Sequence, residues 1–189
     1  MGEPAFRAGA ILHWVYRRSA ASFEEMTDLP QPLRQRLARD LTLRSLVPVD
    51  ERVSSDGQTV KALFRLSDDR TVESALMRYG GGRYTVCIST QVGCAIGCPF
   101  CATGQQGFER NLSAGEMLEQ VLHFVRRLRS QMLRQAQHEK AAPDTARSPV
   151  TNVVFMGMGE PLANYEATWQ CVDMLNASHG LGMGARQMT

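Results

Sequence analysis

Apolar positions near the beginning of the chain recur at helical spacing. They predict an amphipathic helix over residues 5–18, a short second helix that begins at Ser22, and a third helix with Pro32 in its first turn. After Pro48 the apolar period changes to two, which predicts a β-hairpin between residues 57 and 80. The alternating positions of its two strands are Val60, Ala62, Phe64 and Leu66, followed by Val72, Ser74 and Leu76.

The rest of the chain alternates between strand and helix patterns. A largely apolar, β-branched run predicts a strand over residues 84–90. Ser113 and Glu116 predict a capping box that opens a long amphipathic helix. A second apolar run predicts a buried strand over residues 151–156, and a further helical pattern covers residues 165–176.

This order of strand, loop and helix predicts an α/β fold: an incomplete βα barrel of about two βα units, preceded by a small α+β accessory domain. We place the accessory domain at residues 1–78 and the barrel part at 79–189. The polar, proline-containing segment 135–149 predicts a mobile loop, and a third strand begins at residues 185–189. Two βα units cannot close a barrel, so the fold predicted here is incomplete.

The composition of the chain indicates the compartment in which the protein works, but it does not identify a binding partner. Among the 189 residues, 43% are hydrophobic and no apolar run approaches the ~20 residues of a membrane span, which predicts a protein without a membrane segment. Five cysteines and no secretory signal indicate a reducing cytoplasm. The net charge of +2 is too small to indicate a nucleic-acid partner, and the local arginine clusters fit solvated helix faces as well as phosphate contacts.

Three cysteines, Cys94, Cys98 and Cys101, lie within eight residues at C-x3-C-x2-C spacing. Three thiolates bind three irons of a [4Fe–4S] cluster and leave the fourth iron open for a substrate or cofactor. A structural zinc site is the alternative, but it normally takes four ligands from paired C-x2-C motifs, and the chain has no second pair. Disulfides fit poorly with an odd number of cysteines and no signal peptide.

A glycine-rich turn, Gly157-Met158-Gly159-Glu160-Pro161, follows the strand predicted over residues 151–156. By itself it fits an ordinary tight turn between a strand and a helix. In βα barrels, however, the chemistry lies on the loops after the strands, and the cysteine motif follows the preceding strand. A glycine backbone allows a ligand to approach closely, and the Glu160 carboxylate accepts hydrogen bonds from an ammonium group.

Three segments, 85–94, 100–108 and 152–161, closely resemble the dual-specificity RNA methyltransferases of the radical S-adenosylmethionine (SAM) superfamily, the RlmN/Cfr-like family. Residues 6–16 and 26–30 resemble the accessory domain of the same family, so the similarity covers nearly all of the chain. The resemblance implies that the barrel is a radical SAM barrel. It also implies a [4Fe–4S] cluster on Cys94, Cys98 and Cys101, and SAM held at its amino group by Gly159 and Glu160.

The activity implied by the resemblance is methylation of C2 of an adenine in 23S rRNA and in some tRNAs. In the family, one SAM methylates a cysteine, and a second yields a 5′-deoxyadenosyl radical that takes a hydrogen from that methyl group. The carbon radical adds to adenine, a base removes the ring proton, and a second cysteine forms a disulfide that releases the product. The partners implied are 23S rRNA, tRNA and an electron donor such as flavodoxin. The protein itself is expected to be a monomer.

Carried over by position, Cys87 resembles the resolving cysteine and Glu73 the proton acceptor. Without the resemblance, Cys87 reads as an inert buried strand cysteine and Glu73 as a solvent-facing carboxylate. Cys171 lies in a helical pattern and is expected in the core. The methyl-carrying cysteine lies near the carboxyl terminus of the family and has no counterpart here, so we expect an amino-terminal fragment without methyltransferase activity of its own.

Three alternatives stay open. The related antibiotic-resistance methyltransferases modify C8 of the same adenine, and no residue in this chain distinguishes them. A zinc-containing RNA-binding module without catalysis is a different class. A radical SAM enzyme with another substrate is disfavoured by the long match through the segments 91–94 and 157–161.

Overall fold

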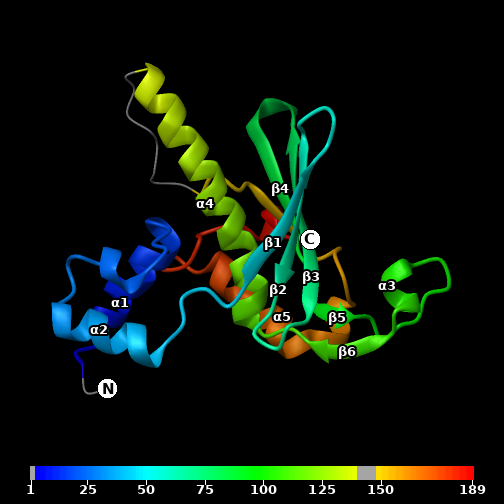
Figure 1. Cartoon of the computed structure of the whole chain (residues 1–189), viewed down its shortest axis with the longest axis horizontal. Helices are drawn as coiled ribbons and strands as arrows, with labels where there is room; N and C mark the ends of the chain where they lie inside the picture. Colours follow the sequence, from blue (N-terminus) through cyan, green and yellow to red (C-terminus); the bar gives the residue numbers. More distant parts are fainter. Residues whose placement is uncertain (1–2, 140–147) are drawn as a thin grey trace.

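A five-stranded mixed sheet forms the centre of the protein, of which the computed structural model describes residues 3–139 and 148–189 (Figure 1). Its strands are β1 (Val47–Val53), β2 (Thr59–Arg65), β3 (Thr71–Tyr79), β4 (Arg83–Cys87) and β7 (Asn152–Val154). They lie in the order β1-β2-β3-β4-β7. The first four pair antiparallel, and β7 lies parallel to β4. The predicted α/β class is confirmed.

The predicted hairpin is confirmed as β2 and β3, with Val60 opposite Leu76 and Phe64 opposite Val72. These four side chains are buried together with Ala62 and Ser74, while the alternate residues Lys61, Leu63, Glu73 and Ala75 face the more exposed side of the sheet, as period two requires. β1 was not predicted. All seven of its residues are exposed, and in the sequence the charged run at residues 50–52 interrupts the alternation of Val47, Val49 and Val53.

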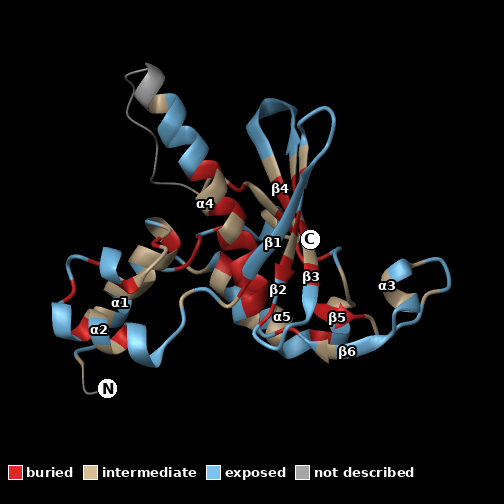
Figure 2. Cartoon of the chain, in the orientation of Figure 1, coloured by how far each residue is buried: buried red, intermediate tan, exposed pale blue. Residues whose placement is uncertain are grey.

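Two helices, α4 (Ala114–Glu139) and α5 (Tyr165–Asn176), contribute to the main hydrophobic core together with the sheet. Figure 2 shows buried positions gathered along α4 and the neighbouring strands. The predicted capping box is confirmed: Glu116 N donates to Ser113 Oγ (3.2 Å), and Ser113 N donates to Glu116 Oε2 (2.8 Å). Cys171 on α5 is fully buried, as expected.

The loop predicted over residues 135–149 is wrong for residues 135–139, which continue α4. Glutamine, alanine and glutamate favour helix, and no glycine or proline interrupts this part of the segment. The rest of that prediction, residues 140–147, lies outside the described residues.

A separate helical unit precedes the sheet (Figure 1). It consists of α1 (Phe6–Leu12), the π-helical η1 (His13–Arg17), the 3-10 turn η2 (Phe23–Glu25) and α2 (Gln31–Asp40). All three helices predicted in this region are confirmed, with Pro32 in the first turn of α2. The unit has its own buried cluster, which comprises Ala20, Phe23, Met26, Leu29, Leu33 and Leu37.

The cysteine motif lies on an arm that projects from the sheet, opposite the helical unit (Figure 1). Two short strands, β5 (Gln91–Gly93) and β6 (Phe108–Asn111), pair antiparallel at its base. A single helical turn, α3 (Ala102–Gln105), lies between them. None of these three elements was predicted, because each is too short for a periodic pattern.

The third strand expected at residues 185–189 is present only as an isolated bridge, because residues Ala185–Gln187 form the 3-10 turn η5. Met188 forms a parallel bridge with Val153, and Thr189 N donates to Val153 O (3.0 Å). The structure contains two βα units, β4–α4 and β7–α5, whose strands pair parallel. The barrel itself stays a prediction. The boundary at residue 78 also stays a prediction, and the five-stranded sheet contains strands from both sides of it. Within the described residues, no helix combines the length and apolar character of a membrane span.

Candidate active site

The segments that follow β4 and β7 lie side by side at the carboxyl edge of the sheet. Gly157 N donates to Ile88 O at 3.0 Å. Thr90 N donates to Met158 O at 2.8 Å, and Met158 N in turn donates to Ser89 Oγ at 2.9 Å. The glycine-rich turn is thus hydrogen-bonded along its length to the segment that leads into the cysteine loop. The glycine-rich turn therefore lies beside the segment that precedes the cysteine motif, and the cysteines lie further out on the arm.

The glycines of the turn are required by this close packing. A Cβ at Gly157 would lie 2.7 Å from the carbonyl carbon and oxygen of Ile88. Gly159 has φ +96°, and a Cβ there would lie 2.5 Å from Cβ of Gln91. The chain's own backbone and Gln91 therefore occupy the space that a side chain would need. The expected role of Gly159 in ligand binding stays a prediction.

Glu160 is half-buried at the end of this turn. Its Oε1 accepts from Leu162 N (2.9 Å), so the carboxylate caps the 3-10 turn η4 (Pro161–Asn164). This hydrogen bond fixes the direction of the carboxylate. An oriented carboxylate next to backbone carbonyls suits a cationic ligand group.

Cys94, Cys98 and Cys101 are each half-buried on the arm. The loop closes at its base through Cys94 N, which donates to Gly107 O (3.0 Å), and turns through Cys101 N, which donates to Cys98 O (3.1 Å). The three cysteines lie on one loop, but their thiols do not point toward a common centre. Within residues 3–139 and 148–189, no three His, Cys, Asp or Glu side chains are arranged to hold a metal ion. The cluster assignment stays a prediction.

The chemistry of the loop nevertheless fits a thiolate-bound cluster. A hydrogen bond from the backbone N–H of Gly104, supported by Thr103, lowers the pKa of the Cys101 thiol. A lowered pKa favours the thiolate, which is the form that binds iron. A Cβ at Gly104 would lie 2.9 Å from Cys98 N, so this glycine lets α3 pack closely against the loop.

Glu73 and Cys87 lie on the same face of the sheet. Ala75 of β3 is opposite Cys87 of β4, and Glu73 is two residues further along β3, so its side chain is on the same side. This is the more exposed face, away from the buried Val72 and Leu76. The structure therefore brings together the two residues that the resemblance singled out.

The surroundings of these two side chains differ. Burial raises the pKa of the Cys87 thiol, and a hydrogen bond from Met156 N–H offsets only part of the effect. Glu73 forms an ion pair with Lys61 Nζ (2.8 Å). Lys61 was missed at the sequence level. The period-two alternation of β2 places it on this face, but only the strand register places it beside Glu73.

Buried polar side chains beneath the site were also missed. Ser89 is fully buried; its N donates to Gln120 Oε1 (2.8 Å), and its Oγ donates to Glu73 O (2.5 Å). Asn164 Nδ2 donates to both Thr90 O (2.8 Å) and Leu112 O (2.7 Å). These bonds connect β3, the β4 loop, α4 and the turn of Glu160. Such connections join segments that are distant in sequence, so no local pattern reveals them.

Ion pairs hold the base of the arm against the sheet. Arg110 on β6 pairs with Asp68 (2.6 Å) in the β2–β3 turn and with Glu116 (2.8 Å) on α4. The Arg110 hydrogen bond is the main reason that the pKa of Asp68 lies well below its usual range. Arg70 adds ion pairs to Asp68 and Glu109.

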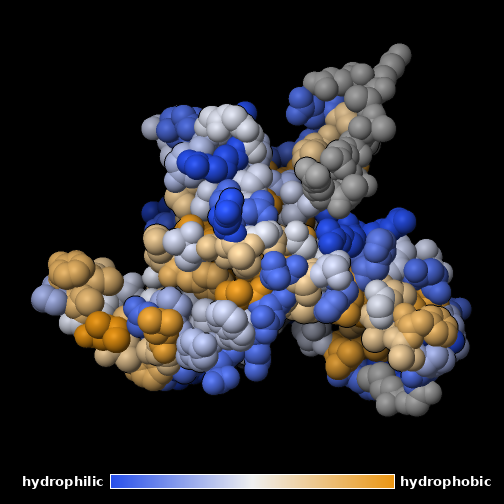
Figure 3. Space-filling model, turned by 180° about the vertical axis from the view of Figure 1, so that it is seen from behind, coloured by the Kyte–Doolittle hydropathy of each residue, from blue (hydrophilic) through white to orange (hydrophobic). Residues whose placement is uncertain are grey.

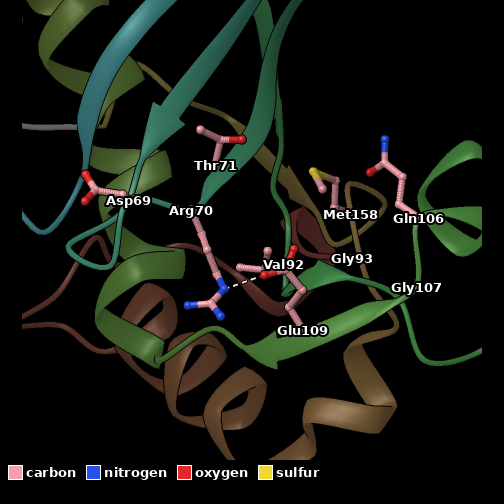
Figure 4. A pocket seen from close by; sticks show the side chains of 9 residues that line it. All are labelled: Asp69, Arg70, Thr71, Val92, Gly93, Gln106, Gly107, Glu109 and Met158. Atoms are coloured by element: carbon pink, nitrogen blue, oxygen red, sulfur yellow. Dashed lines mark hydrogen bonds and ion pairs between the residues drawn. The ribbon is translucent and has the colours of Figure 1, made fainter.

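A pocket of about 230 Å³ lies between the β2–β3 turn, the arm and the glycine-rich turn. In Figure 4, Arg70 and Glu109 form an ion pair in front of β5, and Met158 and Gln106 lie further along the pocket. Its lining comprises Asp69, Arg70, Thr71, Val92, Gly93, Gln106, Gly107, Glu109 and Met158. The pocket thus includes Met158 of the glycine-rich turn and residues on both sides of the cysteine motif, Gly93 and Gln106.

Apolar side chains are exposed around the site. Phe100 and Ile96 on the cysteine loop are 89% and 55% exposed, and Met156 and Leu162 flank the glycine-rich turn at 68% and 74%. Figure 3 shows apolar surface gathered on the projecting arm, at the left of that view.

The fold and these paired loops define a class of protein, the radical SAM methyltransferases. The structure matches the crystal structure of a radical SAM methyltransferase from Sphaerobacter thermophilus with a TM-score of 0.86 and 46% sequence identity. The match covers 99% of this chain and 50% of that chain.

Within that class, the chain belongs to the RlmN family of dual-specificity RNA methyltransferases. It is 44% identical, over 100% of its length, to the probable dual-specificity RNA methyltransferase RlmN of Desulfitobacterium hafniense, and 46% identical to that of Chloroflexus aurantiacus. It covers 50% and 47% of these relatives, about half their length. Residues 1–43 also match the family model described as the ribosomal RNA large subunit methyltransferase N-terminal domain.

Proposed function

We propose that this chain supplies the cluster- and SAM-binding part of a cytoplasmic radical SAM RNA methyltransferase. Its target is C2 of an adenine in 23S rRNA and in tRNA, its electron donor is a protein such as flavodoxin, and it acts as a monomer. Cys94, Cys98 and Cys101 hold the [4Fe–4S] cluster. Gly159 and Glu160 hold the amino end of SAM.

The observation that carries this proposal is the hydrogen-bonded pairing of the segment after β4 with the turn after β7. In enzymes built from parallel βα units, the carboxyl ends of the strands carry the chemistry. One of these segments leads directly into the cysteine loop, and the other ends at Glu160. A cluster and a SAM molecule bound by them would therefore be neighbours.

The residues around this pairing have chemically suitable roles. When bound, the cluster supplies the electron for reductive cleavage of SAM. The Glu160 carboxylate accepts hydrogen bonds from the SAM ammonium group. Glu73, which pairs with Lys61, accepts a proton from the adenine ring. Cys87, half-buried on the same face, supplies the resolving thiol.

Anaerobic reconstitution of the purified chain with iron and sulfide tests the cluster. The proposal predicts about four irons per chain and the visible absorption of an iron–sulfur cluster. Cys101→Ser should lose both, because only two loop thiolates remain. Cys171→Ala is the matched control and should keep both, since Cys171 is buried on α5. Tightly bound zinc without iron–sulfur absorption would instead support the RNA-binding module.

The position of methylation needs a separate measurement. Nucleosides from 23S rRNA and tRNA are compared by mass spectrometry in cells with and without the gene that encodes this chain. Loss of 2-methyladenosine on deletion is the expected result. Loss of 8-methyladenosine would instead establish the C8 activity of the antibiotic-resistance enzymes.

A further inference from the structure

Gln91 is a buried amide that joins the two halves of the candidate site. Its side chain Oε1 accepts from Glu160 N at 2.9 Å. Its Nε2 donates to Asn111 Oδ1 at 2.8 Å. Only 1% of the residue is exposed, so solvent cannot take over these bonds.

The two ends of this bridge have different attachments. Asn111 is the register partner of Gln91 at the base of the arm, where β5 leads to Cys94 and β6 returns from the loop. Glu160 ends the glycine-rich turn after β7. One side chain therefore connects the base of the cysteine loop to the backbone of the carboxylate expected to bind SAM.

The glycine-rich turn is shaped around Gln91. A Cβ at Gly159 would lie 2.5 Å from Gln91 Cβ, 2.7 Å from its Cγ and 2.7 Å from its backbone N. Gly159 thus allows the turn to lie directly on Gln91, which brings the next N–H, that of Glu160, within reach of Oε1. The backbone N of Gln91 adds a hydrogen bond to Met158 O (3.2 Å).

We propose that Gln91 is a positioning residue for SAM: it sets the orientation of Glu160 relative to the cysteine loop. This inference rests on the proposed function, because it assumes that Glu160 binds the SAM ammonium group. Glu160 is held from two sides, by Gln91 at its N–H and by Leu162 N–H at its carboxylate. A carboxylate that is already held in this orientation loses less conformational entropy when the ligand binds than a freely rotating one does.

Removal of the amide leaves buried groups without partners. In Gln91→Met, a side chain of similar length fills the space but cannot bond to Glu160 N–H or to Asn111. An unsatisfied buried donor is unfavourable, so the turn is expected to shift until the N–H finds another acceptor. That shift displaces the Glu160 carboxylate, while the cysteines, further along the arm, still bind the cluster.

The test compares two ligands on the reconstituted chain by anaerobic equilibrium dialysis. SAM carries the ammonium group, and 5′-methylthioadenosine carries the same nucleoside without it. Gln91→Met should weaken SAM binding about tenfold, which corresponds to about 1.4 kcal/mol. It should change methylthioadenosine binding by less than about twofold, with the iron content unchanged, because only the ammonium contact is displaced.

Gln187→Met is the matched control. Gln187 also accepts from a backbone N–H, that of Gly184 (2.6 Å), and donates to a backbone carbonyl, that of Thr151 (2.8 Å). It lies at the opposite end of β7, where Thr151 precedes the strand. Its variant should bind both ligands as the unaltered chain does.

The outcomes separate the two proposals. Equal loss of both ligands in Gln91→Met, or no loss of either, overturns the positioning role while the cluster and SAM site stand. Failure of the unaltered chain to bind SAM overturns the proposed function, and the inference with it.

Discussion

The cysteines of this chain occupy chemically different environments. On the arm, the Gly104 N–H lowers the pKa of the Cys101 thiol. On the sheet, burial raises the pKa of Cys87. In the core, burial raises the pKa of Cys171 to about 12. These differences follow the roles proposed for them, since a metal ligand must be a thiolate and a core cysteine need not react.

Alkylation of the metal-free, reduced chain by iodoacetamide should reveal these differences. The thiolate is the reactive form, so a lower pKa means faster reaction at a given pH. Cys101 should reach its half-maximal rate below the ordinary thiol pKa of about 8.5, and Cys87 above it. Peptide mass spectrometry over a pH series measures both, with Cys171 as an internal control that stays unmodified in the folded chain. Faster labelling of Cys87 than of Cys101 at neutral pH would contradict this assignment.

At the scale of elements, the site depends on how closely one loop packs on another. Gly157 lies against the backbone of Ile88 and Ser89, with contacts for an added Cβ of 2.7 and 2.8 Å. Backbone atoms cannot rotate away as a flexible side chain does. The pairing of the loops is therefore sensitive to a single methyl group.

Gly157→Ala should lower the free energy of unfolding by about 1–3 kcal/mol, because the methyl group forces the paired loops apart. Gly9→Ala is the control, since Gly9 lies in α1 and an added Cβ there meets nothing within 4 Å. Alanine at that helical position should be neutral or stabilise by up to about 1 kcal/mol. Urea unfolding of both variants measures the difference, and an unchanged midpoint for Gly157→Ala would show that the loops adjust freely.

At the scale of the whole molecule, two hydrophobic clusters meet at the π-helical η1. Tyr16 belongs to η1 in the helical unit, but its side chain is buried in the main hydrophobic core. Its neighbour Arg17 donates to Ser178 O (2.8 Å) and Leu181 O (3.3 Å) beyond α5. A Cβ at Gly182 would lie 2.8 Å from Arg17 Nη2, so the loop fits closely around the guanidinium. These contacts attach the amino-terminal unit to the rest of the protein.

Arg17→Gln should loosen this attachment. A hydrogen bond to a charged group contributes about 1.5–3 kcal/mol, so amide exchange in residues 6–40 should accelerate about tenfold or more. Arg18→Gln is the matched control, because Arg18 lies over the Trp14 ring within the helical unit (5.0 Å). Hydrogen–deuterium exchange with mass spectrometry measures both. Equal acceleration in the two variants would assign the attachment to the apolar contacts of Tyr16 instead.

The sequence by itself determined the features that local patterns record. Apolar periodicity located β2, β3, α2 and α5, and the capping box located the start of α4, because burial of one face and closure of a helix end are decided within a few residues. The cysteine spacing and the glycine-rich turn were visible for the same reason. Even so, the polar pattern after residue 134 predicts a loop where α4 continues to Glu139.

Only the tertiary structure decided which distant residues meet. β1 is exposed along its length and β5 and β6 are short, so pairing with their neighbours defines them and no periodicity does. The register of β2, β3 and β4 places Lys61 and Glu73 on the face of Cys87, and loop packing places Gly159 on Gln91. A contact between residues far apart along the chain depends on how all the intervening segments pack, and that information is spread over the whole molecule.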